Sequence, residues 1–206
     1  MKVLGISTSP RENSNSDLLL RKALAGASSA GAGAEYVQLC KLNIKPCTAC
    51  GACYGTGECI IDDDFNVVLS KMLNTQRLIF ATPIYFMTVC SQAKILIDRC
   101  QCLWASKYLL KKPISRTGPN TRQGMVIAVG GTKTKKMFDS IRLTMKYYFD
   151  VLEMGYFANL FVGSVDEAGK IEENAAAMEQ AFQLGVRLSA AEAPADKTIE
   201  IELIGP

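Results

Sequence analysis

Short apolar runs alternate five times along the chain with longer runs in which apolar residues recur at helical spacing. The short runs are typical of buried strands, and the stretch after each is long enough to form a helix. Parallel strands need a crossover connection, usually a helix, so the alternation predicts a parallel sheet with helices on both faces. We predict strands at Lys2–Ser7, Glu35–Leu39, Arg77–Thr82, Gly124–Gly130 and Tyr156–Gly163, and helices at 17–30, 62–74, 92–103, 137–152 and 172–190.

The predicted fold is α/β, a single doubly wound domain that covers residues 1–206 and has a five-stranded parallel sheet. In the flavodoxin-like strand order 2-1-3-4-5, the winding reverses between the first and third strands. The loops after these two strands then lie side by side at the carboxyl edge, where open α/β sheets bind ligands. The tail Thr198–Leu203 alternates apolar and charged residues, so we expect it to add an edge strand or to pair with another subunit.

The composition excludes several classes of protein. Apolar residues make up 49% of the 206, which is enough for a substantial core. The net charge is only +3 and the basic residues are spread out, so nucleic acid is not an expected partner. No apolar run approaches the ~18 residues of a membrane span and no signal peptide is visible, so we expect a cytoplasmic protein without a membrane partner. The chain has no histidine, which excludes Ser-His and Cys-His catalysis, and we name no catalytic side chain.

Four of the eight cysteines lie close together in a loop at about residues 40–61, after the second predicted strand. Cys47, Cys50 and Cys53 form a C-x2-C-x2-C run, and Cys59 follows after five further residues. Three thiolates at this spacing reach three corners of one [4Fe–4S] cluster, and the glycines before Cys59 let the chain double back to the fourth. We predict these four residues as cluster ligands. A zinc site and unliganded thiols are the alternatives, and a disulfide framework is typical of small secreted domains instead.

Other acidic and cysteine residues near this loop have simpler interpretations. Asp62–Asp64 stand at the start of a predicted helix, where carboxylates stabilise the positive end of the helix dipole, and a carboxylate metal site is the alternative. Cys40 is interpreted as a small buried hydrophobic residue. Cys100 and Cys102 are two residues apart on a predicted helix, so they face different ways and do not form a site together.

The loop after the first predicted strand is rich in hydroxyls and amides and leads directly into a helix. A helix N-terminus presents free N–H groups and a positive dipole end to an anion. Ser9, Ser14 and Ser16 add hydroxyl donors and Arg11 adds a positive charge, so we predict a site for a phosphomonoester. Simple helix capping by a serine is the alternative. The loop is not a Walker A sequence and no G-x-G-x-x-G follows a strand, so neither ATP nor a Rossmann-bound dinucleotide is indicated.

The third predicted strand runs into an apolar, aromatic loop formed by Pro83, Ile84, Tyr85 and Phe86. Such a loop at the carboxyl end of a strand offers both faces and edges to a flat aromatic cofactor. A loop that simply packs on the core is the alternative.

The fourth predicted strand ends in Gly130 and Gly131, a turn that permits a ligand to approach the backbone closely. A phosphate site beside a site for a flat ring describes FMN, and we assign this cofactor to the loops after the first, third and fourth strands. The cysteine loop leaves the same edge of the sheet, so we expect the cluster to lie near the flavin.

Several of these motifs occur together: Ser9-Pro10-Arg11, Ser14-Asn15-Ser16, the four cysteines after Pro46, Asp62–Asp64, Pro83-Ile84-Tyr85-Phe86, and Lys94-x3-Asp98-Arg99. In this combination the chain resembles the archaeal and bacterial iron-sulfur flavoproteins, part of the larger NAD(P)H-dependent FMN reductase group of flavodoxin-like proteins. The resemblance covers about the first hundred residues strongly and the rest by pattern. It implies that Asn15 belongs to the FMN site, that each chain holds FMN and one [4Fe–4S] cluster, and that both one- and two-electron transfer occur. It also implies a homodimer or homotetramer in which a cluster can face the flavin of a neighbouring subunit.

The motifs lead to one main function and two alternatives. The main prediction is an oxidoreductase that passes electrons from a carrier such as ferredoxin through the cluster to FMN, and on to oxygen, peroxide or a quinone. The first alternative is an NAD(P)H-dependent FMN or quinone reductase that uses hydride chemistry and keeps the cysteines as a vestigial or zinc-holding loop. The second is a redox sensor that changes its partner when the cluster is lost.

Overall fold

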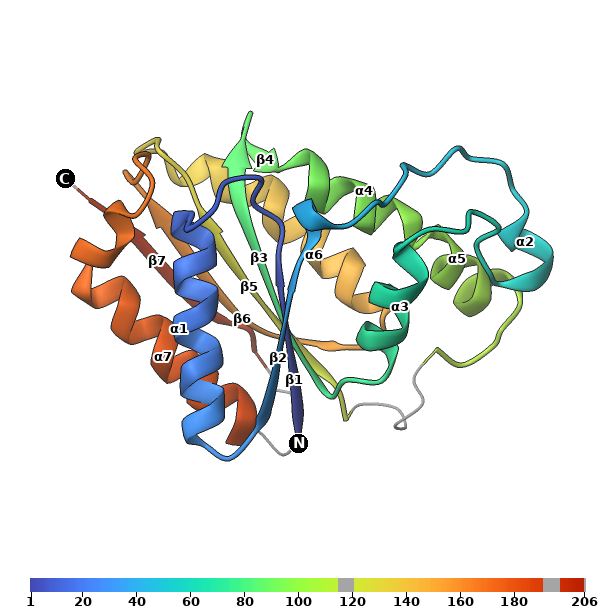
Figure 1. Ribbon diagram of the computed structural model, residues 1–206, viewed down its shortest axis with the longest axis horizontal. Coiled ribbons are helices and arrows are strands. Elements are labelled where there is room, and N and C mark those ends of the chain that lie inside the picture. Colours follow the sequence, from blue (N-terminus) through green and yellow to red (C-terminus); the bar gives the residue numbers. More distant parts are fainter. Residues whose placement is uncertain (115–120, 191–196, 206) are drawn as a thin grey trace.

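A central β-sheet is covered by helices on both faces in the computed structural model, which describes residues 1–114, 121–190 and 197–205 (Figure 1). The main path of the sheet runs β2-β1-β3-β5-β6-β7 with parallel neighbours, and the short β4 pairs antiparallel with the end of β3. The strands are β1 Lys2–Ser7, β2 Gly33–Gln38, β3 Arg77–Tyr85, β4 Thr88–Val89, β5 Gln123–Val129, β6 Gly155–Gly163 and β7 Ile199–Ile204.

The predicted α/β architecture is confirmed, but the predicted number of strands is wrong, because the sheet formed by the described residues has seven strands. The five predicted segments correspond to β1, β2, β3, β5 and β6, and β7 extends the sheet beyond β6. The tail therefore forms an edge strand of its own sheet, the first of the two alternatives. Its apolar side chains Ile199, Ile201 and Leu203 pack against the core cluster that also contains residues of β6.

The helices are α1 Asn15–Ser29, α2 Cys53–Thr56, α3 Phe65–Leu73, α4 Ser91–Arg99, α5 Gln101–Trp104, α6 Asp139–Val151 and α7 Ala175–Ala190. Helices α1 and α7 cover one face of the sheet, and α3, α4, α5 and α6 cover the other (Figure 1). The predicted helix at 92–103 is divided between α4 and α5, and a π-helical turn, η2 (Ala105–Leu109), continues it. In the three described ranges, no helix combines the length and the apolar character needed to cross a lipid bilayer.

Glycines bring α1 and α7 into direct backbone contact. A Cβ atom at Gly26 would lie 2.1 Å from the carbonyl oxygen of Phe182, and one at Gly185 would lie 1.9 Å from that of Ala23. No side chain fits at either position, so the pair of glycines fixes how closely the two helices pack. This contact holds α1, whose first turn belongs to the candidate site, against the rest of the fold.

Two groups of loops leave the carboxyl edge of the sheet in different directions. The loops after β1, β3, β5 and β6 meet above the sheet, beside the start of α1 (Figure 1). The loop between β2 and α3, which carries the cysteines, extends to the far end of the molecule, where α2 lies beside α5 (Figure 1).

Candidate functional site

The loop between β1 and α1 is anchored at both ends. Both the backbone N–H and the hydroxyl of Thr8 donate to the carbonyl oxygen of Ala81 on β3, at 3.0 and 2.9 Å. Ser14 is the N-cap of α1, and its Oγ accepts the backbone N–H of Asp17 at 3.3 Å. The capping role considered from the sequence is therefore real, and the Ser14 hydroxyl still has its own proton to donate.

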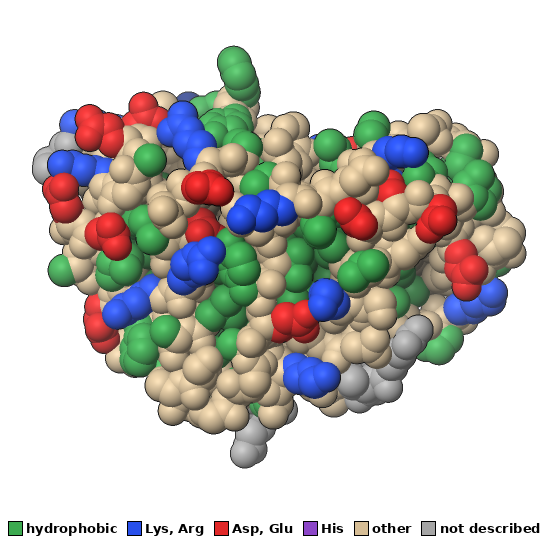
Figure 2. Space-filling model, in the orientation of Figure 1, with side chains coloured by type: hydrophobic (Ala, Val, Ile, Leu, Met, Phe, Trp, Pro, Cys, Tyr) green, Lys and Arg blue, Asp and Glu red, His purple; other side chains and the backbone are tan. Residues whose placement is uncertain are grey.

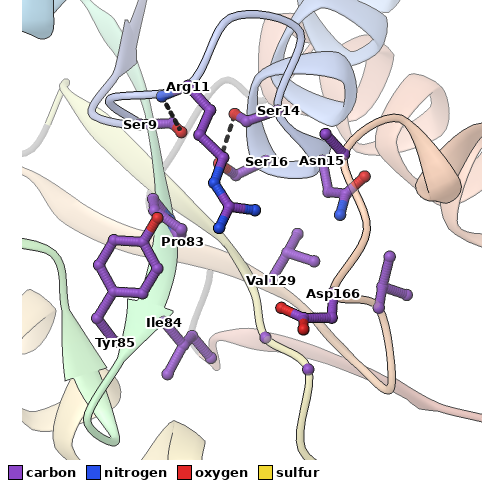
Figure 3. A pocket seen from close by; sticks show the side chains of 14 residues that line it. Ser9, Arg11, Ser14, Asn15, Ser16, Pro83, Ile84, Tyr85, Val129 and Asp166 are labelled. Atoms are coloured by element: carbon purple, nitrogen blue, oxygen red, sulfur yellow. Dashed lines mark hydrogen bonds between the residues drawn. The ribbon is translucent and has the colours of Figure 1, made fainter.

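Serine hydroxyls and one arginine gather over the N-terminus of α1. Ser9 and Ser16 are each only 1% exposed, and the Ser14 and Ser16 hydroxyl oxygens lie 3.5 Å apart. The backbone N–H of Arg11 donates to Ser9 Oγ at 3.2 Å, which folds the loop over the helix start. Figure 3 shows the guanidinium of Arg11 extending into the middle of the cleft, between this loop and Asp166.

Three further loops complete the cleft, which has about 400 Å³ of empty space including the part open to solvent. The end of β3 forms one wall, the turn after β5 forms the floor, and the loop after β6 closes the opposite side (Figure 3). The structure thus brings the sequence-predicted residues together around one cleft, with the exception of Phe86. The lining residues are Ser9, Arg11, Ser14, Asn15, Ser16, Pro83, Ile84, Tyr85, Val129, Gly130, Gly131, Val165, Asp166 and Ala168.

Phe86 does not line the cleft. It lies at the tip of the β3–β4 hairpin, where Tyr85 pairs with Thr88, and its side chain is fully exposed. Phe86 and Met87 both have left-handed backbone conformations, with φ of 49° and 64°, as a two-residue hairpin turn requires. Figure 2 shows the hydrophobic hairpin tip standing clear of the surface. The sequence placed four residues in an apolar loop, but the tight turn directs the last of them away from the cleft.

The side chain of Asn15 serves a structural role beside the cleft. Its Nδ2 donates to the carbonyl oxygen of Glu167 at 2.8 Å, and its Oδ1 accepts the backbone N–H of Ile171 at 3.2 Å. Both ends of the amide are thus bound to the loop after β6. The sequence analysis missed this loop, with Val165, Asp166 and Ala168, although the rule that ligands bind where parallel strands end would have indicated it.

The cleft fits a flavin mononucleotide by its chemistry. Buried hydroxyls, the free N–H groups of the first turn of α1 and the Arg11 guanidinium are donors that suit a phosphate dianion. Pro83, Ile84 and the ring of Tyr85 form an apolar wall next to them, as a flat ring system requires (Figure 3). Asp166 is the one acidic side chain among the lining residues, and it lies across the cleft from the serines (Figure 3).

The four clustered cysteines line a second cavity. Its other lining residues include Tyr54, Ile60, Ile61, Arg99, Gln101 and a fifth thiol, Cys102. Burial, together with the neighbouring thiols of Cys59, Cys47 and Cys50, raises the pKa of Cys53. Burial and the same cysteine group raise the pKa of Cys102 to about 12, so this thiol is protonated at neutral pH. Cys100 is also buried, beside Tyr148, and unlike Cys102 it does not line the cavity.

The cysteine cavity has the donors for an iron-sulfur cluster but not yet the geometry of a closed metal site. Within the described ranges, no three cysteine or carboxylate side chains lie close enough to hold one metal ion. All eight cysteines are free thiols, which leaves those of the loop available as ligands. A cubane cluster needs four thiolates, and Cys47, Cys50, Cys53 and Cys59 all line this cavity, the first three with C-x2-C-x2-C spacing in the sequence. The residue types therefore fit an iron-sulfur cluster. To bind one, the loop would have to change conformation so that the four sulfur atoms come closer to one another.

The acids after the cysteine loop stabilise its fold. The Asp63 carboxylate accepts the backbone N–H groups of Lys45 and Phe65 at 2.9 and 3.0 Å, and Asp64 accepts that of Asn43 at 2.7 Å. Burial alone would raise the pKa of Asp63, but the hydrogen bonds from Arg99 and from these backbone groups lower it below the ordinary value. The carboxylates connect the start of α3 to the start of the loop, so the helix begins at Phe65 rather than at Asp62.

Two expectations about this region are wrong. The cysteine cavity and the flavin cleft share no lining residue, and Figure 1 shows α2 of the cysteine loop at one end of the molecule, away from the start of α1. The cluster site is therefore not next to the flavin site of its own chain. Cys40, predicted to be buried, is exposed because it lies in a short helical turn on the surface (Leu39–Lys41), where only Leu39 points inward.

Comparisons with known proteins identify the family of the chain. Residues 1–197 match the model of the family described as NADPH-dependent FMN reductase. An iron-sulfur flavoprotein of Methanocaldococcus jannaschii is 40% identical over 103 residues, which are 50% of this chain and 53% of that protein. A second iron-sulfur flavoprotein of the same organism is 34% identical over 155 residues, 75% of this chain and 73% of the relative. The chain thus spans only about half the length of the first relative.

The fold also matches solved structures. An NAD(P)H:quinone oxidoreductase from Methanothermobacter marburgensis superposes with a TM-score of 0.68 at 16% identity, covering 91% of this chain and 96% of the other. At this identity the match supports the flavodoxin-like fold and nothing further.

Proposed function

The chain belongs to the NADPH-dependent FMN reductase family and is related within it to iron-sulfur flavoproteins, and on that premise we propose that it is a redox flavoprotein with two sites. FMN binds in the cleft above β1, β3, β5 and β6, and a [4Fe–4S] cluster binds at Cys47, Cys50, Cys53 and Cys59. The observation that carries the proposal is the cleft, which combines buried phosphate donors with an apolar wall. A cytoplasmic location is part of the same proposal.

The residues of the cleft divide the work of binding FMN. Ser9, Ser14 and Ser16, together with the N–H groups that begin α1, hold the phosphate, and Arg11 neutralises part of its charge. Tyr85 and the residues before it pack against the flavin ring. The turn at Gly130 and Gly131 lets the ring approach the backbone.

The two groups, when bound, supply the redox chemistry, and the proposed route runs from a carrier such as ferredoxin through the cluster to FMN and on to oxygen, peroxide or a quinone. The protein's own contribution is to position the two groups and to limit access of water to them. Cys47 and Cys50 are exposed, so a carrier protein can approach this end of the molecule.

A second copy of the chain is part of the proposal. The cysteine cavity and the cleft lie apart in one chain, so transfer between them calls for a homodimer or homotetramer in which one subunit's loop covers another's cleft. Mixing a Cys50→Ser variant with an Arg11→Ala/Ser16→Ala double variant tests this. At an FMN concentration that leaves the double variant unloaded, we expect ferredoxin to reduce FMN faster in the mixture than in either variant alone. A mixture of demonstrated hetero-oligomers that stays inactive contradicts transfer between subunits.

The main proposal is tested on protein prepared under anaerobic conditions. We expect about four irons and four sulfides per chain together with one FMN. Reduced ferredoxin should reduce the flavin rapidly, and in Cys50→Ser this reaction should slow by at least roughly tenfold while a small chemical reductant acts as before. Stoichiometric zinc without iron excludes the cluster, and an unchanged rate in the variant excludes the cluster as the path for electrons.

The second candidate is an NAD(P)H-dependent FMN or quinone reductase, which the family match favours. The same preparation distinguishes the two candidates. If NADPH bleaches the flavin at equal rates in the intact protein and in Cys50→Ser, whereas ferredoxin has no effect, a nicotinamide is the donor and the cysteine loop is not needed for the reaction.

A further inference from the structure

Arg99, the last residue of α4, is buried under the cysteine loop. Its side chain has no exposed surface, and it lines the cysteine cavity together with Cys59 and Cys102. Among the described residues, its Nε is one of the few buried side-chain atoms without a hydrogen-bond partner. A buried donor left unpaired is costly, so such an atom beside a cavity needs an explanation.

The other nitrogens of Arg99 hold the two ends of the cysteine loop. One terminal nitrogen donates to the carbonyl oxygen of Lys45 at 2.9 Å and to the Asp63 carboxylate at 2.7 Å. The second donates to the carbonyl oxygen of Ile61 at 3.1 Å. Lys45 precedes the first cysteine of the motif and Ile61 follows the last, so one guanidinium closes the whole loop. The ring of Phe65 lies 4.4 Å from the guanidinium carbon and fixes its plane.

Within the described part of the chain, Nε is the one guanidinium nitrogen of Arg99 without a hydrogen-bond partner, and the cavity that Arg99 lines holds thiols, which bind metals as anions. Burial alone would lower the pKa of Arg99, but the Asp63 carboxylate and, after it, the nearby Cys59 thiol raise it above its ordinary value. The residues that line the cavity include no carboxylate. Sulfur ligands of a cluster carry negative charge and accept hydrogen bonds, and such bonds adjust both affinity and reduction potential.

We propose that Arg99 is a positioning residue of the cysteine site. Its two terminal nitrogens bind the backbone at Lys45 and Ile61 and so close the loop, and its Nε–H donates a hydrogen bond to the Cys59 sulfur when the cluster is bound. The site thereby holds an anionic metal-sulfur guest more tightly than four cysteines on an untethered loop would. The inference rests on the proposed function, because it takes the guest to be an iron-sulfur cluster.

The test compares Arg99→Lys with Arg122→Lys. Arg122 is also fully buried and donates to three carbonyl oxygens, those of Thr75, Leu152 and Met72, but it lies away from the cysteine cavity. In each variant lysine keeps the positive charge, but the hydrogen bonds of a buried guanidinium are lost. Arg122→Lys therefore measures how much such a loss affects the protein when it occurs away from the cysteine cavity. The measurements are iron bound after anaerobic reconstitution and the rate at which a chelator removes it, with FMN affinity as the check of the remaining fold.

We expect Arg99→Lys to lose iron at least about tenfold faster than the wild type, in the range found when the partners of metal ligands are removed. Arg122→Lys should lose iron at the wild-type rate, and FMN affinity should be unchanged in Arg99→Lys. Before iron is added, a protease should cut the cysteine loop faster in Arg99→Lys than in Arg122→Lys. Equal iron loss in the two variants overturns the proposal.

A measurement on the wild type covers the case in which Arg99→Lys does not fold. Protein with all arginines labelled with ¹⁵N is loaded and reduced, and electron–nuclear double resonance detects nitrogen next to the cluster. A ¹⁵N coupling supports the hydrogen bond, and its absence overturns it while leaving the cluster itself in place. If the wild type binds no iron and sulfide at all, the proposed cluster falls and the role of Arg99 falls with it.

Discussion

Removing single donors from the phosphate site should weaken FMN in a ranked way. Ser16 lies in the first turn of α1 and is 1% exposed, so its hydroxyl competes little with water. A hydrogen bond to a charged group contributes about 1.5–3 kcal/mol. We therefore expect Ser16→Ala to weaken FMN binding by about tenfold to a hundredfold, since 1.4 kcal/mol corresponds to a factor of ten.

Arg11 should matter less, although it carries a full charge. Its side chain is exposed, so solvent screens its attraction for the phosphate, and Arg11→Ala should cost about 1 kcal/mol, or roughly fivefold in affinity. Screening length falls from ~10 Å at 0.1 M salt to ~3 Å at 1 M. The effect of Arg11→Ala should therefore shrink at high salt, whereas the effect of Ser16→Ala should stay.

The assay is titration of flavin-free protein with FMN and with riboflavin, followed by quenching of flavin fluorescence. Riboflavin has no phosphate, so neither substitution should change its affinity. Ser29→Ala at the other end of α1 is the matched control, because the Ser29 hydroxyl donates to the Gly26 carbonyl far from the cleft. Equal losses for FMN and riboflavin would refute the assignment of this loop to phosphate.

Three further outcomes are expected. Cys50→Ser should abolish the broad visible absorption of a cluster and lower bound iron, as measured by metal analysis, while FMN stays bound, because the two sites share no residue. Gly185→Ala should destabilise the protein in urea unfolding by about 1–3 kcal/mol or more, since its Cβ meets the Ala23 carbonyl, and an unchanged midpoint would contradict the close contact of α1 and α7. Burial and the hydrogen bond to Asp17 raise the pKa of Tyr36 from 10.0 to about 12, so the folded state keeps a proton that the unfolded state loses. Stability should therefore fall as pH rises from 10 to 12, and Tyr36→Phe should remove that part of the slope, which urea unfolding at several pH values will show.

The sheet was predictable to the extent that each strand carries a local signal. The buried strands read as continuous apolar runs, and their parallel pairing follows from the helical crossovers between them. β7 was ambiguous because alternating residues suit an edge strand of this sheet as well as one paired with another subunit. β4 is only two residues long and has no periodicity to detect.

The packing of α1 on α7 was not predictable from local sequence. Gly26 and Gly185 lower helix propensity, and nothing in their neighbourhoods shows that two backbones meet there. The start of α3 was missed for a similar reason. Asp63 and Asp64 look like residues of a first helical turn, but their carboxylates bind backbone N–H groups about twenty residues earlier in the chain.

Most of the cleft was predictable because its residues occupy a position that the fold itself specifies. Ser9 and Ser16 follow β1, and Pro83 and Tyr85 end β3, so the reversal of winding brings them together. Phe86 shows the limit of this rule, since one residue along a tight turn reverses the direction of the side chain. Asn15 shows a second limit, because its side-chain amide binds the loop after β6, which carries no recognisable sequence motif.

The position of the cysteine site shows why a shared sheet edge is not a shared location. Because β1, β2 and β3 are parallel, all three end at the carboxyl edge of the sheet. The direction that the cysteine loop takes after β2 depends on the residues against which it packs. Here the buried pair of Arg99 and Asp63, 2.7 Å apart, holds the loop against α4 and α3, away from the cleft. A buried ion pair is stable only if its other polar atoms also have hydrogen-bond partners. Here the loop backbone supplies most of these partners. The carbonyl oxygens of Lys45 and Ile61 accept from Arg99, and the N–H of Lys45 donates to Asp63. Contacts between residues far apart in sequence therefore decide where the cysteine site lies relative to the cleft.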